Sequence, residues 1–93
     1  MVYLQITMTI PLEKRTTATE IYKKYKTPFL NTIQGAVSKE LLVRELDVQV
    51  IHGFETLNDA ESYLQSELFT NDVVIELKPL FTVAPDIRIY QSA

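Results

Sequence analysis

The chain has 93 residues, of which 46% are hydrophobic and 23% are charged, and its formal net charge is −3 at pH 7. This length allows one domain, residues 1–93, with a modest core. The acidic balance argues against nucleic-acid binding, which needs a basic surface, and the absence of cysteine excludes disulfides and cysteine-based zinc sites. There is no secretory signal and no apolar run of the roughly 20 residues that a membrane span needs, so we expect a cytoplasmic protein.

Residues 1–10 alternate between apolar and polar side chains, and none of these side chains is charged. The apolar ones share one face of a predicted strand: Val2, Leu4, Ile6, Met8 and Ile10. The other face is polar but neutral and carries Tyr3, Gln5, Thr7 and Thr9. A strand face in bulk water usually carries lysine, glutamate or aspartate. We therefore expect a second subunit or a small molecule to cover the neutral face.

The first predicted helix follows this strand, which ends at Pro11 because proline has no N–H for the ladder. Thr17 and Glu20 fit a capping box, in which a threonine N-cap is followed three residues later by a glutamate. Pro28 is expected to kink or interrupt the helix, since it removes one backbone hydrogen bond. Gly35 is a plausible C-terminal stop.

Two strands are predicted next, over Glu40–Leu46 and Val48–Phe54, with a turn at Asp47. In the second of these strands, alternation places His52 on the same face as Val48, Val50 and Phe54. That face is otherwise apolar.

The remainder of the chain predicts two short helices and a last strand. Asn58 is the expected N-cap of the first helix, with Glu61 three residues later. The second helix is expected to begin near Thr70 or Asn71, and Ile87–Tyr90 alternates as the final strand.

The resulting order is β-α-β-β-α(α)-β, a ferredoxin-like α+β fold. It predicts a four-stranded antiparallel sheet with helices on one face. No segment of the chain is left to cover the other face. A second copy, packed sheet against sheet, would do so, and we therefore predict a homodimeric barrel.

The stretch His52–Leu64, followed by Ser66–Phe69, combines a strand ending in an aromatic residue, a polar turn, and a helix with alanine and an aromatic facing the sheet. This pattern resembles the dimeric α+β barrel superfamily, which includes antibiotic-biosynthesis monooxygenases and stress-responsive barrel proteins. The resemblance implies the fold above over nearly the whole chain. Some members oxidise aromatic polyketides or quinols with oxygen and no added cofactor, and others degrade haem.

The haem-degrading members use an asparagine, a tryptophan and a histidine, and several oxygenating members carry a tryptophan in the cavity. This chain has no tryptophan, and its one histidine lies on a predicted strand. These departures count against haem degradation and weaken the case for an oxygenase. We expect neither a cofactor nor a metal.

His52 is the only side chain that titrates near neutrality without help from its surroundings, so it is the one candidate general base. Its apolar neighbours favour a structural role, as a hydrogen-bonded histidine inside the core. A metal site is disfavoured, because no other imidazole exists and no carboxylate shares its strand face.

A second candidate set consists of polar side chains that could contact a ligand inside a barrel. Its members are Tyr3, Gln5, Thr7, Arg44, Arg88 and Tyr90. Arg88 and Tyr90 share one strand face; an arginine there could hold an anionic oxygen and a tyrosine could stack on an aromatic ring. Alternatively, Arg88 pairs with a carboxylate and Tyr90 packs in a dimer interface.

Two functions follow from these observations. The first is a small homodimeric barrel that binds an apolar or aromatic molecule between sheet and helices, with cofactor-independent oxygenase activity as its enzymatic form. The alternative is a non-enzymatic interaction or stress-associated dimer. No nucleophile–base pair or other catalytic signature decides between them.

Overall fold

A computed structural model describes residues 1–93. Its main elements, in chain order, are β1 (Val2–Met8), α1 (Arg15–Thr32), β2 (Ala36–Val43), β3 (Val48–Phe54), α2 (Leu57–Leu64), α3 (Val74–Leu77) and β4 (Asp86–Gln91). This order confirms the predicted ferredoxin-like α+β fold.

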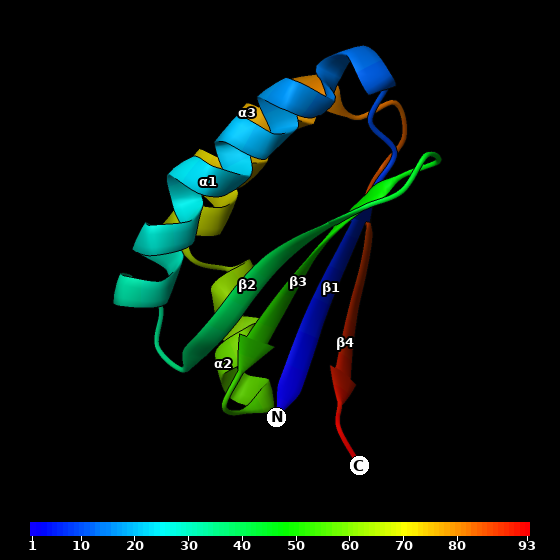
Figure 1. Ribbon diagram of the computed structural model, residues 1–93. Helices are drawn as coiled ribbons and strands as arrows, with labels where there is room; N and C mark the ends of the chain where they lie inside the picture. Colours follow the sequence, from blue (N-terminus) through cyan, green and yellow to red (C-terminus); the bar gives the residue numbers. More distant parts are fainter.

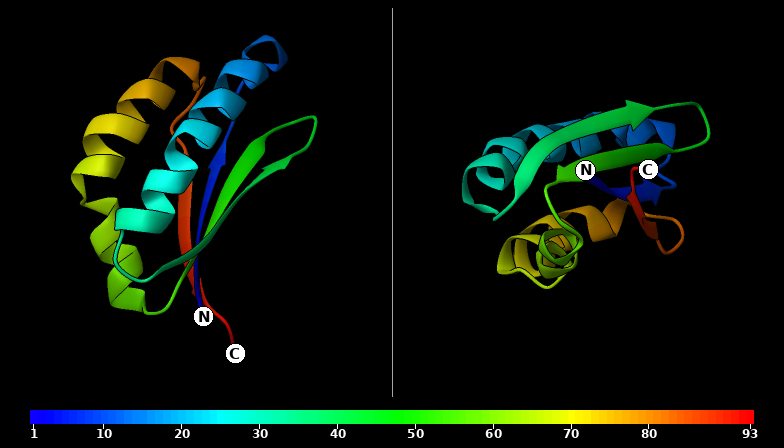
Figure 2. Two further views of the ribbon diagram at one scale, coloured as in Figure 1. Left: turned by 60° about the vertical axis from the view of Figure 1, so that its left-hand side comes forward. Right: turned by 90° about the horizontal axis from the view of Figure 1, so that it is seen from below.

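The four strands form one antiparallel sheet in the order β2-β3-β1-β4. β1 lies in the middle, with Leu4 opposite His52 of β3 and Ile89 of β4. The helices all lie on one side of this sheet, and α1 and α3 run next to each other (Figures 1 and 2). The opposite face of the sheet is bare in this single chain.

The hydrophobic core fills the space between the helices and the sheet. The apolar face of β1 is part of it, as its alternation predicts. At one end of the core, the rings of Phe29, Phe54 and Tyr63 surround His52. Phe29 makes edge-to-face contacts with Phe54 and Tyr63 at ring-centroid distances of 5.5 and 5.0 Å. Packing of this kind adds to the stabilisation from area burial alone.

Tyr63 carries a buried hydroxyl group that has no hydrogen-bond partner. A buried polar group without a partner loses its hydrogen bonds to water and gains none in return. We therefore expect Tyr63→Phe to raise the free energy of unfolding by about 1 kcal/mol, measured by urea denaturation. The matched control is Tyr25→Phe, which removes a hydroxyl that donates to the Glu76 carboxylate and should lower stability. Equal losses in both variants would contradict the prediction.

Helix α1 differs from its prediction in two respects, the residue at which it begins and the effect of Pro28. It begins at Arg15 and not at Thr17, after a 3-10 turn, and no side chain caps it. The Arg15 guanidinium instead donates to the carbonyls of Ile10, Arg44 and Glu45, which fixes the start of the helix through distant contacts. Pro28 does not interrupt the helix, which continues to Thr32.

Gly35 follows α1 in the turn to β2 and has a φ of +76°, which glycine adopts without steric cost. A β-carbon at this position would lie 2.1 Å from a carboxylate oxygen of Asp59. The close approach of α2 therefore reinforces the conformational requirement for glycine. The predicted stop signal is correct, three residues beyond the end of the helix.

The predictions for α2 and β2 are correct in type but shifted along the chain. The N-cap of α2 is Thr56 and not Asn58, because the Thr56 hydroxyl accepts a hydrogen bond from the Asp59 amide at 3.1 Å. Strand β2 begins at Ala36, earlier than predicted, and ends at Val43. A bidentate ion pair between Arg44 and Asp47 closes the turn that follows.

The segment before α3 contains a wide helical turn over Leu68–Val73. The amide of Val74 donates to the carbonyl of Phe69, five residues earlier, which is the hydrogen-bond pattern of a π-helix. The Ser66 hydroxyl accepts from the Phe69 amide at 3.2 Å and so caps this turn. The helix expected near Thr70 thus begins at Leu68 and continues through α3 to a final 3-10 turn over Lys78–Leu80.

The bare face of the sheet carries the neutral side chains of β1. Tyr3, Gln5 and Thr7 are half-buried, and their neighbours on β4 are Tyr90, Arg88 and Asp86. We call these six residues, together with Gln49 and Ile51 of β3, the open face. Arg88 forms an ion pair with Asp86 at 3.0 Å, within its own strand.

Candidate functional site

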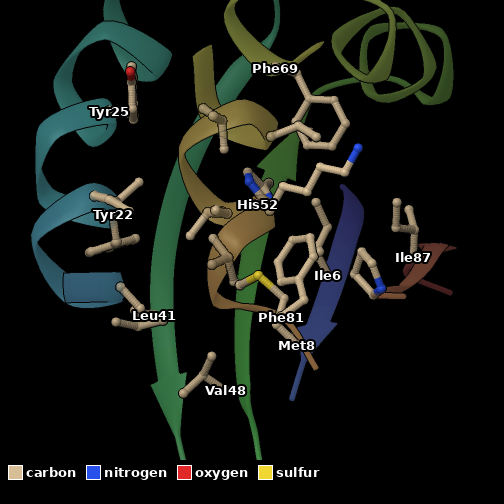
Figure 3. Close-up of a pocket in the computed structure, with 18 of the residues that line it drawn as sticks. Ile6, Met8, Tyr22, Tyr25, Leu41, Val48, His52, Phe69, Phe81 and Ile87 are labelled. Atoms are coloured by element: carbon tan, nitrogen blue, oxygen red, sulfur yellow. The ribbon is translucent and has the colours of Figure 1, made fainter. Parts of the chain in front are cut away.

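A cavity of about 690 Å³ lies between the sheet and the two helices α1 and α3. Of its 23 lining residues, 17 are hydrophobic. This volume is within the range of pockets that bind small organic ligands. In Figure 3, side chains from both helical segments and all four strands point toward the cavity.

Each wall of the cavity comes from a different part of the fold (Figure 3). Tyr22 and Tyr25 belong to α1, which faces the sheet with its apolar side. The core face of the sheet forms the floor of the cavity, and Ile6 is one of the residues there. Phe69 stands on the π-helical turn, and Phe81 begins the loop that leads to β4. The apolar lining is therefore the part of the core that side chains leave unfilled.

The cavity opens toward solvent between the π-helical turn, the loop before β4, and β4 itself. The lining residues on this side are exposed, among them Thr70, Val83 and Ile87. The residues at the opposite end, next to the aromatic cluster, are buried. A ligand entering from the exposed side would thus reach the buried polar groups last.

Lys39 is the buried charged group of this cavity, with only 3% of its surface exposed. Its Nζ atom lies 5.2 Å from the centre of the Phe29 ring, a cation–π contact, and has no hydrogen-bond or ion-pair partner. Burial lowers the pKa of Lys39 to about 8. The Tyr22 hydroxyl donates to the Lys39 carbonyl at 2.7 Å, which ties this part of β2 to α1.

His52 lies on the strand next to Lys39 and is 2% exposed. Its Nδ1–H donates to the Leu4 carbonyl at 3.1 Å, since a carbonyl oxygen only accepts. Burial, followed by the charge of Lys39, lowers the pKa of His52 to about 3. The imidazole is therefore neutral at pH 7, with its Nε2 unprotonated.

His52 thus combines the two roles that the sequence left open. It is a hydrogen-bonded core histidine, in contact with the Phe29 ring at 5.2 Å, and it also lines the cavity. Its low pKa makes it a weak base, so a role in orienting or hydrogen-bonding a ligand suits it better than proton abstraction.

The six residues predicted to bind a ligand do not line this cavity. Their set was Tyr3, Gln5, Thr7, Arg44, Arg88 and Tyr90; five of them lie on the open face, and Arg44 lies in the β2–β3 turn. The predicted grouping of Arg88 and Tyr90 with the neutral face of β1 agrees with the register. The sheet separates these residues from the space between sheet and helices, and their contact with a ligand inside a barrel stays a prediction.

Lys39 was missed, although its sequence contains a usable signal. Val37, Lys39, Leu41 and Val43 alternate, so the lysine interrupts an otherwise apolar series. Because lysine side chains are mostly solvent-exposed, Lys39 was not distinguished from the other lysines of the chain.

Nowhere in the structure do three or more histidine, aspartate or glutamate side chains come together as metal ligands would. None of the helices combines the length and hydrophobicity that a membrane span requires.

Comparison with solved structures identifies the fold. A protein from Nitrosomonas europaea, provisionally named an antibiotic biosynthesis monooxygenase, superimposes with a TM-score of 0.83 at 10% identity, covering 99% of this chain and 98% of that one. The chain shares the ferredoxin-like α+β fold of this protein. A conserved protein from Methanosarcina mazei Go1 superimposes with a TM-score of 0.84 at 12% identity over 99% of this chain and 92% of that one.

Rv0793 from Mycobacterium tuberculosis has a similar fold, with a TM-score of 0.80 at 12% identity over 99% of this chain and 94% of that one. No family model and no curated protein matches the sequence. The shared fold therefore extends over nearly the whole chain, and identities of 10–12% carry no information on its chemistry.

Proposed function

We propose that this protein binds a small apolar or aromatic molecule in the cavity between its helices and its sheet. The cavity itself carries the proposal: about 690 Å³, lined mostly by hydrophobic side chains, with two polar groups at its buried end. A folded core normally leaves few voids larger than a water molecule. A space of this size, open on one side, is what a ligand-binding protein needs.

The binding experiment is a thermal-unfolding screen with naphthalene- and anthracene-sized compounds. A ligand present at 100 times its dissociation constant stabilises the folded state by about 2.7 kcal/mol, so we expect a rise in Tm of several degrees. Val50→Phe, which places a ring in the cavity from β3, should abolish this rise while the protein still folds. A screen in which no compound shifts the Tm would overturn the proposal.

If the protein is an enzyme, we propose that it is an oxygenase that acts on the molecule bound in this cavity. Several proteins with this fold carry the name antibiotic biosynthesis monooxygenase, and an apolar cavity suits a quinol or a phenolic polyketide. Such substrates react with O₂ in their deprotonated form, and a buried cation would stabilise that form. The test is oxygen consumption with quinols and anthrones; binding without oxygen uptake would identify a ligand-binding protein and not an oxygenase.

We also propose that two chains pair through the open face. Its central side chains are neutral, and the β4 residues on the same face, Asp86, Arg88 and Tyr90, are exposed. A second copy of the chain would cover both features at once, with the same surface contributed by each subunit. The alternative function, an interaction dimer without small-molecule chemistry, relies on this same face and predicts no ligand.

A further inference from the structure

Lys39 is a buried ammonium group for which the protein supplies no anion. The three ion pairs of the structure all lie elsewhere, between Lys24 and Glu76, within the Arg44–Asp47 turn, and within β4. Removing a charge from water without a partner is costly, and natural proteins pair almost all such groups. The Phe29 ring offsets only part of that cost.

The charged groups facing the cavity are all of one sign. Lys39 lies at its buried end and Lys78 at its exposed side, and no aspartate or glutamate lines it, although the chain as a whole is acidic. His52 on β3 also lines the cavity and is neutral at pH 7, because burial lowers its pKa to about 3. The cavity is therefore positively charged inside a protein of net charge −3.

We infer that the molecule bound in this cavity carries one anionic oxygen, a carboxylate, phenolate or enolate, and that this oxygen pairs with the Lys39 ammonium while the apolar body occupies the hydrophobic lining. This inference rests on the proposed function and adds the chemical class of the ligand. The neutral His52 next to Lys39 adds no second positive charge, and its unprotonated Nε2 can only accept a hydrogen bond, so Lys39 is the one group here that pairs with the anionic oxygen. A charge-assisted contact in a desolvated site is about twice as strong as a neutral one.

The pKa of Lys39 supports this pairing by a separate route. At pH 8 about half of the Lys39 side chains are unprotonated, because burial lowers the pKa to about 8. An anion next to the ammonium would raise that pKa again, so binding should take up part of a proton per site at pH 8. Calorimetry in two buffers of different ionisation enthalpy measures this uptake directly.

The test compares three naphthalene probes that differ only in charge: 2-naphthoate, 2-naphthamide and 2-naphthylmethylamine. At pH 7 we expect the wild-type protein to bind 2-naphthoate at least 10-fold more tightly than the neutral amide, and the amine most weakly.

The variant Lys39→Met keeps most of the length of the side chain and removes the charge. It should fold, since it replaces a buried cation by an apolar group, and should bind 2-naphthoate at least 10-fold more weakly while its affinity for the amide changes less than about 3-fold. Lys78→Met is the matched control, because Lys78 lines the same cavity but is exposed, and there we expect less than a 3-fold change.

The possible failures are distinguishable. Equal affinity of the wild type for naphthoate and naphthamide would overturn the inference and leave the proposed function standing. An effect of Lys78→Met as large as that of Lys39→Met would also overturn it. If none of the probes binds and the compound screen is likewise negative, the proposed function fails and the inference fails with it. If Lys39→Met does not fold, Lys39→Gln takes its place. The comparison of 2-naphthoate with 2-naphthamide in the wild type also tests the inference without any variant.

Discussion

Acid is expected to destabilise this protein through His52 by roughly 1 kcal/mol per pH unit between pH 6.5 and pH 3. The pKa of the folded-state imidazole is about 3, because burial and the charge of Lys39 disfavour its protonation. In the unfolded chain the pKa is about 6.5. Below pH 6.5 the unfolded state thus binds a proton that the folded state does not, and stability falls as the pH falls. The total loss by pH 3 is about 4 kcal/mol.

The measurement is denaturant unfolding at pH 7, 6, 5 and 4 and at fixed protein concentration, followed by circular dichroism. Carboxylates also titrate in this range, so the wild type is compared with His52→Asn. An asparagine amide can still donate to the Leu4 carbonyl but does not titrate. The difference between the two stability curves should shrink with falling pH. Parallel curves would show that His52 is not responsible.

A lysine in place of Gln5 is expected to weaken self-association by 100-fold or more. Gln5 lies at the middle of the open face, between Ile51 of β3 and Arg88 of β4. In a dimer packed sheet against sheet, each subunit would bury one additional cation next to an arginine. An uncompensated buried charge costs about 3–5 kcal/mol, which corresponds to at least two orders of magnitude in the dissociation constant.

Light scattering coupled to gel filtration measures this effect. At micromolar concentration the wild type should have twice the 10.7 kDa mass of the chain, and Gln5→Lys should have the mass of one chain with an unchanged circular dichroism spectrum. Thr16→Lys, on the exposed surface of α1, makes the same charge change away from the open face and should stay dimeric. A wild-type mass of one chain would refute the dimer.

Periodicity alone predicted most of the fold. The alternation in β1 and β3 identified the core face, because successive side chains of a strand point to opposite faces of the sheet. The bounds of α1 could not be obtained in this way, because Arg15 is held by carbonyls near residues 10 and 44, which no local pattern reveals. The cap of α2 was misplaced for a different reason: both Thr56 and Asn58 have side chains that can accept, and only the backbone decides between them.

The candidate site was less predictable than the fold. His52 was found because histidine is rare in this chain and its neighbours alternate with it. The cavity was not predicted from the sequence. A void depends on how the side chains of several elements pack against one another, and no single segment of the sequence specifies that. The neutral face of β1 was correctly recognised as unusual, but it lies on the side of the sheet away from the cavity.

The π-helical turn has a consequence for how this cavity could change in related chains. The inward side chains of this turn and of α3, Phe69, Val73 and Leu77, are spaced by four residues. In a regular helix of 3.6 residues per turn, side chains at this spacing move gradually away from one face. The wider turn absorbs part of that drift and keeps all three directed at the sheet. Deleting one residue from Leu68–Val73 would restore regular winding and rotate everything before it by about 100° relative to α3. A change of one residue in length, without any substitution, would therefore exchange the side chains of one whole wall.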